Sequence, residues 1–258
     1  QGREALFDAE HFFDGWKANR DYALACIRAA HEAGARWVVL CDTNGGTLPV
    51  EIGRIVAEVI AAGIPGDRLG IHTHNDTANA VAGSLAAVDA GARQIQGTLN
   101  GLGKRCGNAN LVTLIPTLLL KQPYASLYET GVSHAALREL TTISRQLDDI
   151  LNRVPTKQAP FVGASAFAHK AGLHASAILK APETYEHVDP ALVGNARVIP
   201  MSNQAGQSNL RRRLAEAGIE VEKGDPALGR MLAEVKERED RGYTYDSAQA
   251  SFELLARE

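Results

Sequence analysis

The side chains best suited to chemistry are two histidines separated by one residue, in the hexapeptide 71–76 (IHTHND). The apolar residues before them predict a buried strand, and alternation along a strand puts His72 and His74 on the same face, about 7 Å apart at Cα. Two imidazoles at this spacing can bind one divalent ion. A pair of hydrogen-bonded histidines near a strand end is the alternative, and the tripeptide alone leaves both interpretations open.

A second candidate is the glycine-rich segment 101–110 (GLGKRCGNAN), which directly follows the next predicted strand. Its three glycines allow tight turns and close approach of a ligand to the backbone, and Asn108 lies near the start of a predicted helix. The spacing matches neither a dinucleotide-binding motif nor a P-loop. A tight turn with an asparagine cap explains the segment as well, so the segment alone assigns no ligand.

Both segments belong to a repeated unit of β-rich run, loop, amphipathic helix and glycine. Helices are expected to be capped by Asn19, to begin at Pro49, and to be capped by Asn75 or Asp76. Four such units predict a parallel sheet with helical crossovers, which fits a doubly wound sheet or half of an eight-stranded barrel. In a barrel, active sites lie at the carboxyl ends of the strands. The strands are expected at 5–9, 36–41, 69–74 and 94–99.

The pattern changes after residue 121. One long helix is expected over 133–152, a proline-containing linker over 154–163, and charged surface helices from about residue 225. We therefore expect residues 1–152 to form the barrel region and residues 153–258 to form a linker followed by mostly helical subdomains.

The composition excludes several classes of protein. The 258 residues are 45% hydrophobic and 22% charged, as in a globular protein, and the net charge of -3 argues against nucleic-acid binding. The arginine triplet 211–213 is expected to be a solvated helix face. The longest apolar run, 111–120, is too short to span a bilayer. Three cysteines at unrelated spacings suit the reducing cytoplasm, and the absence of an initial Met suggests an internal piece of a longer chain.

Taken together, HTHNDTANAVAGS (72–84) and QGTLNGLGKRCGNANL (96–111) resemble the isopropylmalate, homocitrate and citramalate synthase family of metal-dependent TIM barrels. FDAEHFFDGWKAN (7–19) and LCDTNGGTLP (40–49) resemble the (R)-citramalate synthase branch. The resemblance implies an α/β fold: the C-terminal half of a TIM (β/α)8 barrel followed by mainly helical lid subdomains. The first barrel strands and a C-terminal regulatory domain would lie outside this chain. The likeness continues through HKAGLHASAI (169–178), ETYEHVDPALVGN (183–195) and YTYDSAQASFELL (243–255).

The resemblance also implies a set of metal ligands. His72, His74 and Asn108 occupy the positions of family ligands. The fourth ligand, an aspartate beside a catalytic arginine on the first barrel strand, has no counterpart in this chain. One departure is Gly103-Lys104-Arg105 where the family usually has Gly-Glu-Arg, which reverses a charge beside a ligand.

Four further residues acquire roles from the resemblance. Glu10 matches an active-site glutamate, Thr43 matches a threonine that contacts the keto-acid carboxylate, and His174 matches the catalytic histidine of the lid. Tyr185 matches the tyrosine that partners this histidine. Without the resemblance, Glu10 would be a surface loop acid and Thr43 a turn hydroxyl.

The implied reaction is condensation of acetyl-CoA with pyruvate to (R)-citramalate, in isoleucine biosynthesis, with a Mn, Zn or Mg ion. The full-length protein is expected to be a cytoplasmic homodimer. The nearest alternatives use 2-ketoisovalerate or 2-ketoglutarate in the same chemistry. Others are an acyl-CoA lyase of the 3-hydroxy-3-methylglutaryl type, which lacks the lid of residues 154–258, and a non-catalytic remnant that dimerises or binds CoA.

Overall fold

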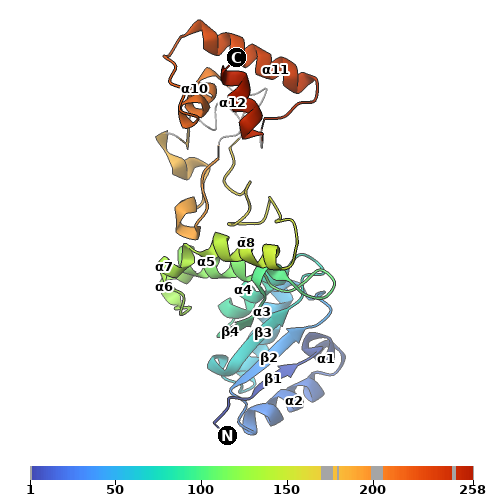
Figure 1. Cartoon of the computed structure of the whole chain (residues 1–258). Coiled ribbons are helices and arrows are strands. Elements are labelled where there is room, and N and C mark those ends of the chain that lie inside the picture. The colour runs from blue at the N-terminus through green and yellow to red at the C-terminus, as the bar shows by residue number, and fades with distance from the viewer. Residues whose placement is uncertain (1, 170–176, 179, 199–205, 246–247, 258) are drawn as a thin grey trace. The chain divides into compact units, whose positions relative to one another are not determined.

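The computed structural model describes residues 2–169, 177–178, 180–198, 206–245 and 248–257. These fall into two compact units, Gln1–Val132 and Ser133–Glu258. The division expected after residue 152 remains a prediction about domain organisation. Figure 1 shows the chain coloured from the N-terminus to the C-terminus.

The first unit is built on a four-stranded parallel sheet in which the strand order follows the sequence, β1-β2-β3-β4 (Figure 1). A helical crossover follows each of the first three strands, and α5 follows β4. The strands are β1 (Leu6–Ala9), β2 (Trp37–Asp42), β3 (Leu69–Thr73) and β4 (Gln94–Gln96). The helices are α1 (Phe12–Ala18), α2 (Arg20–Glu32), α3 (Pro49–Ala61), α4 (Ala80–Asp89), α5 (Leu111–Leu120) and α6 (Tyr124–Leu127).

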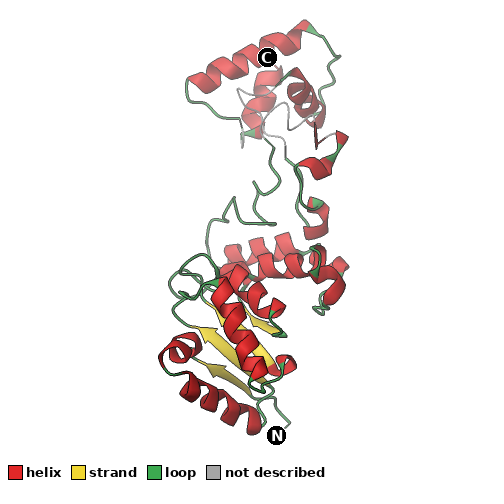
Figure 2. Cartoon of the chain, turned by 180° about the vertical axis from the view of Figure 1, so that it is seen from behind, coloured by secondary structure: helices red, strands yellow, loops and turns green. Residues whose placement is uncertain are grey.

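This topology decides between the two predicted architectures. A doubly wound sheet reverses its strand order and carries helices on both faces, whereas the order here never reverses. One face of the sheet packs against α2, α3 and α4 alike, and Figure 2 shows helices lying across that face. The four units therefore have the arrangement of half a (β/α)8 barrel. The strand residues in this core are Ala9, Val38, Leu40, Leu69 and Ile71, with Ile95 packed against them.

The other face of the sheet is the inner face of the half-barrel, and it becomes polar toward the carboxyl ends of the strands. Parallel register places Cys41 beside His72, and His72 beside Gln96. Asp8 shares this face through its register with Val39. The candidate chemistry thus lies on the side that a barrel encloses.

Most predicted boundaries are confirmed, because local capping determines them. Asn19 caps α2 by accepting a hydrogen bond from the Tyr22 amide at 3.1 Å, and α3 begins at Pro49. The sequence pattern does not predict α1, whose buried aromatic residues begin directly after β1.

Two predicted boundaries are wrong. Helix α4 begins at Ala80 instead of following Asn75 or Asp76, because the intervening turn contains Ala78 in the left-handed conformation, with φ 59°. The strand expected over 94–99 ends at Gln96, beyond which Thr98 bonds to the returning residues 109 and 111.

Helix α5 coincides with the apolar run 111–120 and includes Pro116. No helix in the described part of the chain combines the length and apolar character needed to cross a membrane.

The second unit is mainly helical and contains a separate apolar cluster formed by its last three helices. The long helix predicted over 133–152 is divided into α7 (His134–Leu137) and α8 (Leu140–Ile150). The turn at Gly194 packs against the break between them, where a Cβ at Gly194 would lie 1.9 Å from the Arg138 carbonyl oxygen. Arg213 is buried over the Phe252 ring instead of solvated as expected. The helices are α7 (His134–Leu137), α8 (Leu140–Ile150), α10 (Gln207–Glu216), α11 (Pro226–Asp240) and α12 (Gln249–Arg257).

Candidate active site

The two histidines of the strand-end motif lie together, as alternation along the strand predicts. His72 is in β3, His74 directly follows it, and the ring centroids are 4.9 Å apart with planes tilted by 34°. Asn108 reaches the same place from the loop after β4, where it forms an isolated antiparallel bridge with His74. The flanking amides secure this bridge: Asn75 N–H donates to the Gly107 carbonyl at 2.9 Å.

Two glycines allow Asn108 to reach that position. Gly107 has φ 89°, and a Cβ there would lie 1.9 Å from the Gly101 carbonyl oxygen. At Gly103 a Cβ would lie 2.1 Å from Asn108 Nδ2. Side chains at Gly107 and Gly103 would therefore displace the asparagine. Asn108 is not a helix cap, because Asn110 caps α5 by accepting from the Val112 amide.

His72 faces an amide oxygen at each ring nitrogen. Nδ1 lies 2.8 Å from Gln96 Oε1, and Nε2 lies 2.9 Å from Asn108 Oδ1. Gln96 is fixed in this orientation because its Nε2 donates to Asp8 Oδ1. Asn108 is fixed because its Nδ2 donates to the Leu102 carbonyl. A neutral imidazole has one N–H, so only one of its two nitrogens can donate to an amide oxygen. At the other nitrogen, the nitrogen lone pair faces an oxygen lone pair unless a proton or another cation lies between them.

A divalent cation fits these groups. With the Nδ1 proton donated to Gln96, the Nε2 lone pair of His72 and the oxygen of Asn108 are both available as ligands. Two ligands at right angles, each about 2.1 Å from an octahedral ion, lie roughly 3 Å apart. His74 Nδ1 lies 3.2 Å from the Asp42 carbonyl oxygen and donates to it, which leaves its Nε2 lone pair free. Metal-ligating histidines ordinarily make such an outer hydrogen bond.

The donors within this site are nitrogen and amide oxygen. Burial, together with the Asp8 and Glu10 carboxylates, raises the pKa of the neighbouring Cys41 to about 12, so this thiol is protonated at neutral pH. Among the residues that the structure describes, no three His, Cys, Asp or Glu side chains gather closely enough to hold a metal ion. The described donors are therefore His72, His74 and Asn108.

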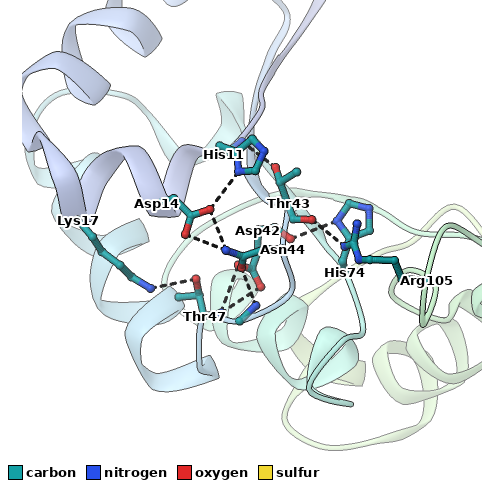
Figure 3. Close-up of polar contacts among 10 residues, drawn as sticks. His11, Asp14, Lys17, Asp42, Thr43, Asn44, Thr47, His74 and Arg105 are labelled. Carbon is teal, nitrogen blue, oxygen red and sulfur yellow. Dashed lines mark hydrogen bonds and ion pairs between the residues drawn. The ribbon is translucent and has the colours of Figure 1, made fainter.

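An arginine connects the loops around the histidines (Figure 3). Arg105 donates to both carboxylate oxygens of Asp76, at 2.7 and 2.9 Å, and to the Thr43 carbonyl at 2.8 Å. These hydrogen bonds hold the pKa of Asp76 below its ordinary value. Arg105 itself has a left-handed backbone, with φ 55°. The loops after β2, β3 and β4 are thereby joined in one polar network.

Thr43 lies at the carboxyl end of β2, and a backbone amide from the loop after β1 orients its hydroxyl. The His11 backbone N–H donates to Thr43 Oγ1 at 2.7 Å, which leaves the hydroxyl hydrogen for another acceptor. His11 takes a left-handed conformation, φ 56°, to make this contact. Asp14 accepts hydrogen bonds from the His11 ring and from Asn44, and so links the segments that follow β1 and β2 (Figure 3).

The remaining expected residues lie elsewhere or outside the described range. Glu10 is exposed directly after β1, at the same end of the sheet as Thr43. Tyr185 belongs to the second unit, follows the 3-10 helix η3 (Pro182–Thr184) and is 44% exposed. His174 lies outside the described residues.

Sequence reasoning missed Gln96, Asp8 and Arg105. The signal available for Asp8 was a carboxylate within the otherwise apolar strand β1, which indicates a functional position without naming its partner.

The sequence pattern of the family described as HMGL-like matches residues 9–143, which is more than half of the chain. The chain belongs to the HMGL-like family. Its HMGL-like region contains the whole histidine–asparagine site. A second pattern, described as homocitrate synthase post-HMGL domain-like, matches residues 161–243.

Relatives of this HMGL-like chain extend the likeness over its whole length. It is 51% identical to an (R)-citramalate synthase of Synechocystis, covering 100% of this chain and 47% of that protein. It is 50% identical to an (R)-citramalate synthase of Aquifex aeolicus, covering 98% of this chain and 47% of that protein. It is 38% identical to a probable 2-isopropylmalate synthase of Methanopyrus kandleri, covering 92% of this chain and 44% of that protein. The chain thus spans about half the length of these relatives.

Proposed function

We propose that the protein containing this chain is an acyltransferase that condenses acetyl-CoA with pyruvate to give (R)-citramalate and CoA. The observation that carries the proposal is the convergence of His72, His74 and Asn108 at the carboxyl end of the half-barrel, in a chain about 50% identical to relatives named (R)-citramalate synthase. The lower identity to a probable 2-isopropylmalate synthase favours pyruvate over the larger keto acids.

His72, His74 and Asn108 would hold a divalent cation of the Mn, Zn or Mg type, since imidazole and amide oxygen suit all three. The cation would polarise the keto-acid carbonyl and stabilise the negative charge that develops on its oxygen. The outer hydrogen bonds from the two histidines to Gln96 and Asp42 orient their rings for this task.

The keto-acid carboxylate is assigned to Thr43. Its hydroxyl accepts from the His11 amide and can donate its own hydrogen to another acceptor, and a carboxylate oxygen is the acceptor that the proposed substrate offers. Glu10 follows the neighbouring strand at the same end of the sheet, and we assign it to the active site by resemblance.

Carbon–carbon bond formation needs a base for the acetyl methyl group. We assign this role to His174, with Tyr185 as its partner, from their positions in the family motif. The base takes a methyl proton, the resulting carbanion attacks the pyruvate carbonyl carbon, and the alkoxide gains a proton. Water then cleaves the thioester, which releases citramalate and the CoA thiol. By the same resemblance, we infer a cytoplasmic homodimer.

A substrate comparison tests the proposal. Free thiol release is measured with acetyl-CoA and pyruvate, 2-ketoisovalerate or 2-ketoglutarate, with Mn²⁺ present. We expect kcat/KM for pyruvate to exceed that for 2-ketoisovalerate by roughly tenfold or more, the discrimination that added methyl groups allow in a fitted pocket. Equal turnover, or preference for a bulkier acid, would contradict the substrate assignment. Cleavage of a hydroxyacyl-CoA without condensation would indicate a lyase, and metal binding without either reaction a non-catalytic protein.

A further inference from the structure

A hydrogen-bonded chain leads from β1 through β4 to the candidate ligand His72. Asp8 Oδ1 accepts from Gln96 Nε2 at 3.0 Å, and Gln96 Oε1 faces His72 Nδ1 at 2.8 Å. A carboxylate only accepts hydrogen bonds, so Asp8 decides which end of the Gln96 amide faces the imidazole. The amide oxygen then requires a proton on His72 Nδ1, which leaves the Nε2 lone pair toward Asn108.

We propose that Asp8 and Gln96 are positioning residues that set the tautomer and ring orientation of His72 for metal binding. The presence of a metal rests on the proposed function. The orientation of His72 rests on the described contacts of Asp8, Gln96 and His72. The negative charge of Asp8 polarises the amide, and this strengthens the hydrogen bond that Gln96 accepts. The outer partner thereby raises the basicity of the ligand nitrogen on the opposite side of the ring.

The same contact depends on the curvature of the sheet. β1 and β4 are the outer strands of the order β1-β2-β3-β4, and three strand spacings would separate them by about 14 Å in a flat sheet. Their side chains nevertheless meet at 3.0 Å on the inner face. Closing the half-barrel and orienting His72 are therefore coupled through Gln96.

Gln94 provides a matched comparison on the same strand face. It precedes Gln96 by two residues, so its side chain points to the same side. Its Oε1 is buried without a hydrogen-bond partner among the described residues, above Gly70, where a Cβ would lie only 2.3 Å from it. A glutamine on this face thus does not acquire the Asp8 and His72 contacts by position alone.

The test compares Gln96→Leu, Asp8→Asn and Gln94→Leu in the intact protein, with Mn²⁺ affinity measured by titration calorimetry. Gln96→Leu should weaken Mn²⁺ binding about 10–100-fold, the usual cost of a lost outer partner, and Asp8→Asn should have a smaller effect. Gln94→Leu should stay within about twofold of wild type. The double variant Asp8→Asn/Gln96→Leu should be no weaker than Gln96→Leu, because both residues act through one contact.

The nitrogen chemical shifts of His72 in the metal-free protein provide a second measurement, independent of metal. Wild type should show the proton on Nδ1, and Gln96→Leu should show a mixture of tautomers. Unchanged shifts in Gln96→Leu, or equal losses of affinity in Gln96→Leu and Gln94→Leu, would overturn the inference. If wild type binds none of Mn²⁺, Zn²⁺ and Mg²⁺, the proposed function fails, and the nitrogen shifts still decide whether Asp8 and Gln96 orient His72.

Discussion

At the scale of single residues, the candidate ligands differ in how firmly their surroundings fix them. His72 donates from Nδ1 to a glutamine that Asp8 fixes in turn, whereas His74 has its outer hydrogen bond to a backbone carbonyl at 3.2 Å. Asn108 is held by Leu102 and by the glycines around it. All three atoms expected to meet a cation are left with lone pairs, which is the property that metal binding requires.

Replacing either histidine by alanine should remove a direct ligand. We expect His72→Ala and His74→Ala in the intact protein each to weaken Mn²⁺ binding by more than the roughly 10–100-fold cost of losing an outer partner, and to abolish thiol release. His134→Ala, at an exposed position in α7, is the control and should match wild type. Stoichiometric metal retained by both site variants would disprove the ligand assignment.

Sequence alone places some of these residues together and not others. Period-two alternation predicts that His72 and His74 share a face, and the ring separation of 4.9 Å confirms it. No local pattern predicts that Asp8 contacts Gln96, which is 88 residues away, because that contact depends on sheet curvature. Likewise, the left-handed backbone of Arg105 reflects tertiary contacts, since arginine does not favour that conformation.

At the scale of elements, the active end of the half-barrel depends on loops that are joined by side chains. Arg105 links the loops after β2, β3 and β4 through Thr43 and Asp76, and Figure 3 shows its contact with Thr43. A guanidinium can span a carboxylate and a carbonyl together, whereas a lysine ammonium provides a point charge without that fork.

We therefore expect Arg105→Lys to loosen the loop that carries Thr43. The KM for pyruvate should rise several-fold while the KM for acetyl-CoA changes little, because only the keto-acid carboxylate is assigned to Thr43. Steady-state kinetics with each substrate varied in turn gives the answer. Arg54→Lys, on the exposed side of α3, serves as the control. A matching rise in both KM values would indicate general damage instead of a keto-acid effect.

In the second unit, one buried carboxylate joins distant parts of the chain. Glu186 has a side chain only 2% exposed, accepts two hydrogen bonds from Arg197 and lies 3.1 Å from His169 Nε2. The hydrogen bonds from Arg197, assisted by His169, lower the pKa of Glu186 despite its burial. Because the pKa of Glu186 is lower in the folded state, ionised Glu186 stabilises the fold. This stabilisation is fully present above the unfolded-state pKa and disappears as pH falls through the folded-state pKa.

Glu186→Gln should accordingly destabilise the second unit at neutral pH. We expect a loss of about 2 kcal/mol, below the full cost of breaking a buried pair because Arg197 remains partly exposed. Thermal unfolding by circular dichroism at several pH values measures it, with exposed Glu183→Gln as the control. The difference from wild type should shrink as pH falls below the ordinary glutamate range. A difference independent of pH would contradict an ionic role for Glu186.

Element boundaries separate what sequence can predict from what it cannot. Asn19 and Pro49 locate helix starts because capping and proline geometry act within a few residues. The break between α7 and α8 escapes prediction, because Gly194 packs against Arg138 from far along the chain. β4 is shorter than predicted because the returning loop, which also carries Asn108, takes over its hydrogen bonding.

At the scale of the whole molecule, the sheet has two outer strands. β1 and β4 each pair on one side only within the described sheet, and Leu6 and Phe7 on β1 are 47% and 37% exposed. Unpaired strand edges and exposed apolar side chains promote association with other strands. A parallel barrel ordinarily satisfies such edges by closing on itself.

Residues 1–258 expressed alone should therefore form no citramalate, even where the chain stays in solution. We infer that the two imidazoles and one amide oxygen are too few ligands for a divalent ion, and among the described residues no three His, Cys, Asp or Glu side chains gather closely enough to hold one. Adding the other four β/α units of the barrel, as a fusion or as a separate chain, should restore Mn²⁺ affinity and thiol release together. The control is the same addition to a His72→Ala/His74→Ala chain, which should restore neither. Substantial citramalate formation by residues 1–258 alone would show that the catalytic groups of this half-barrel are already complete.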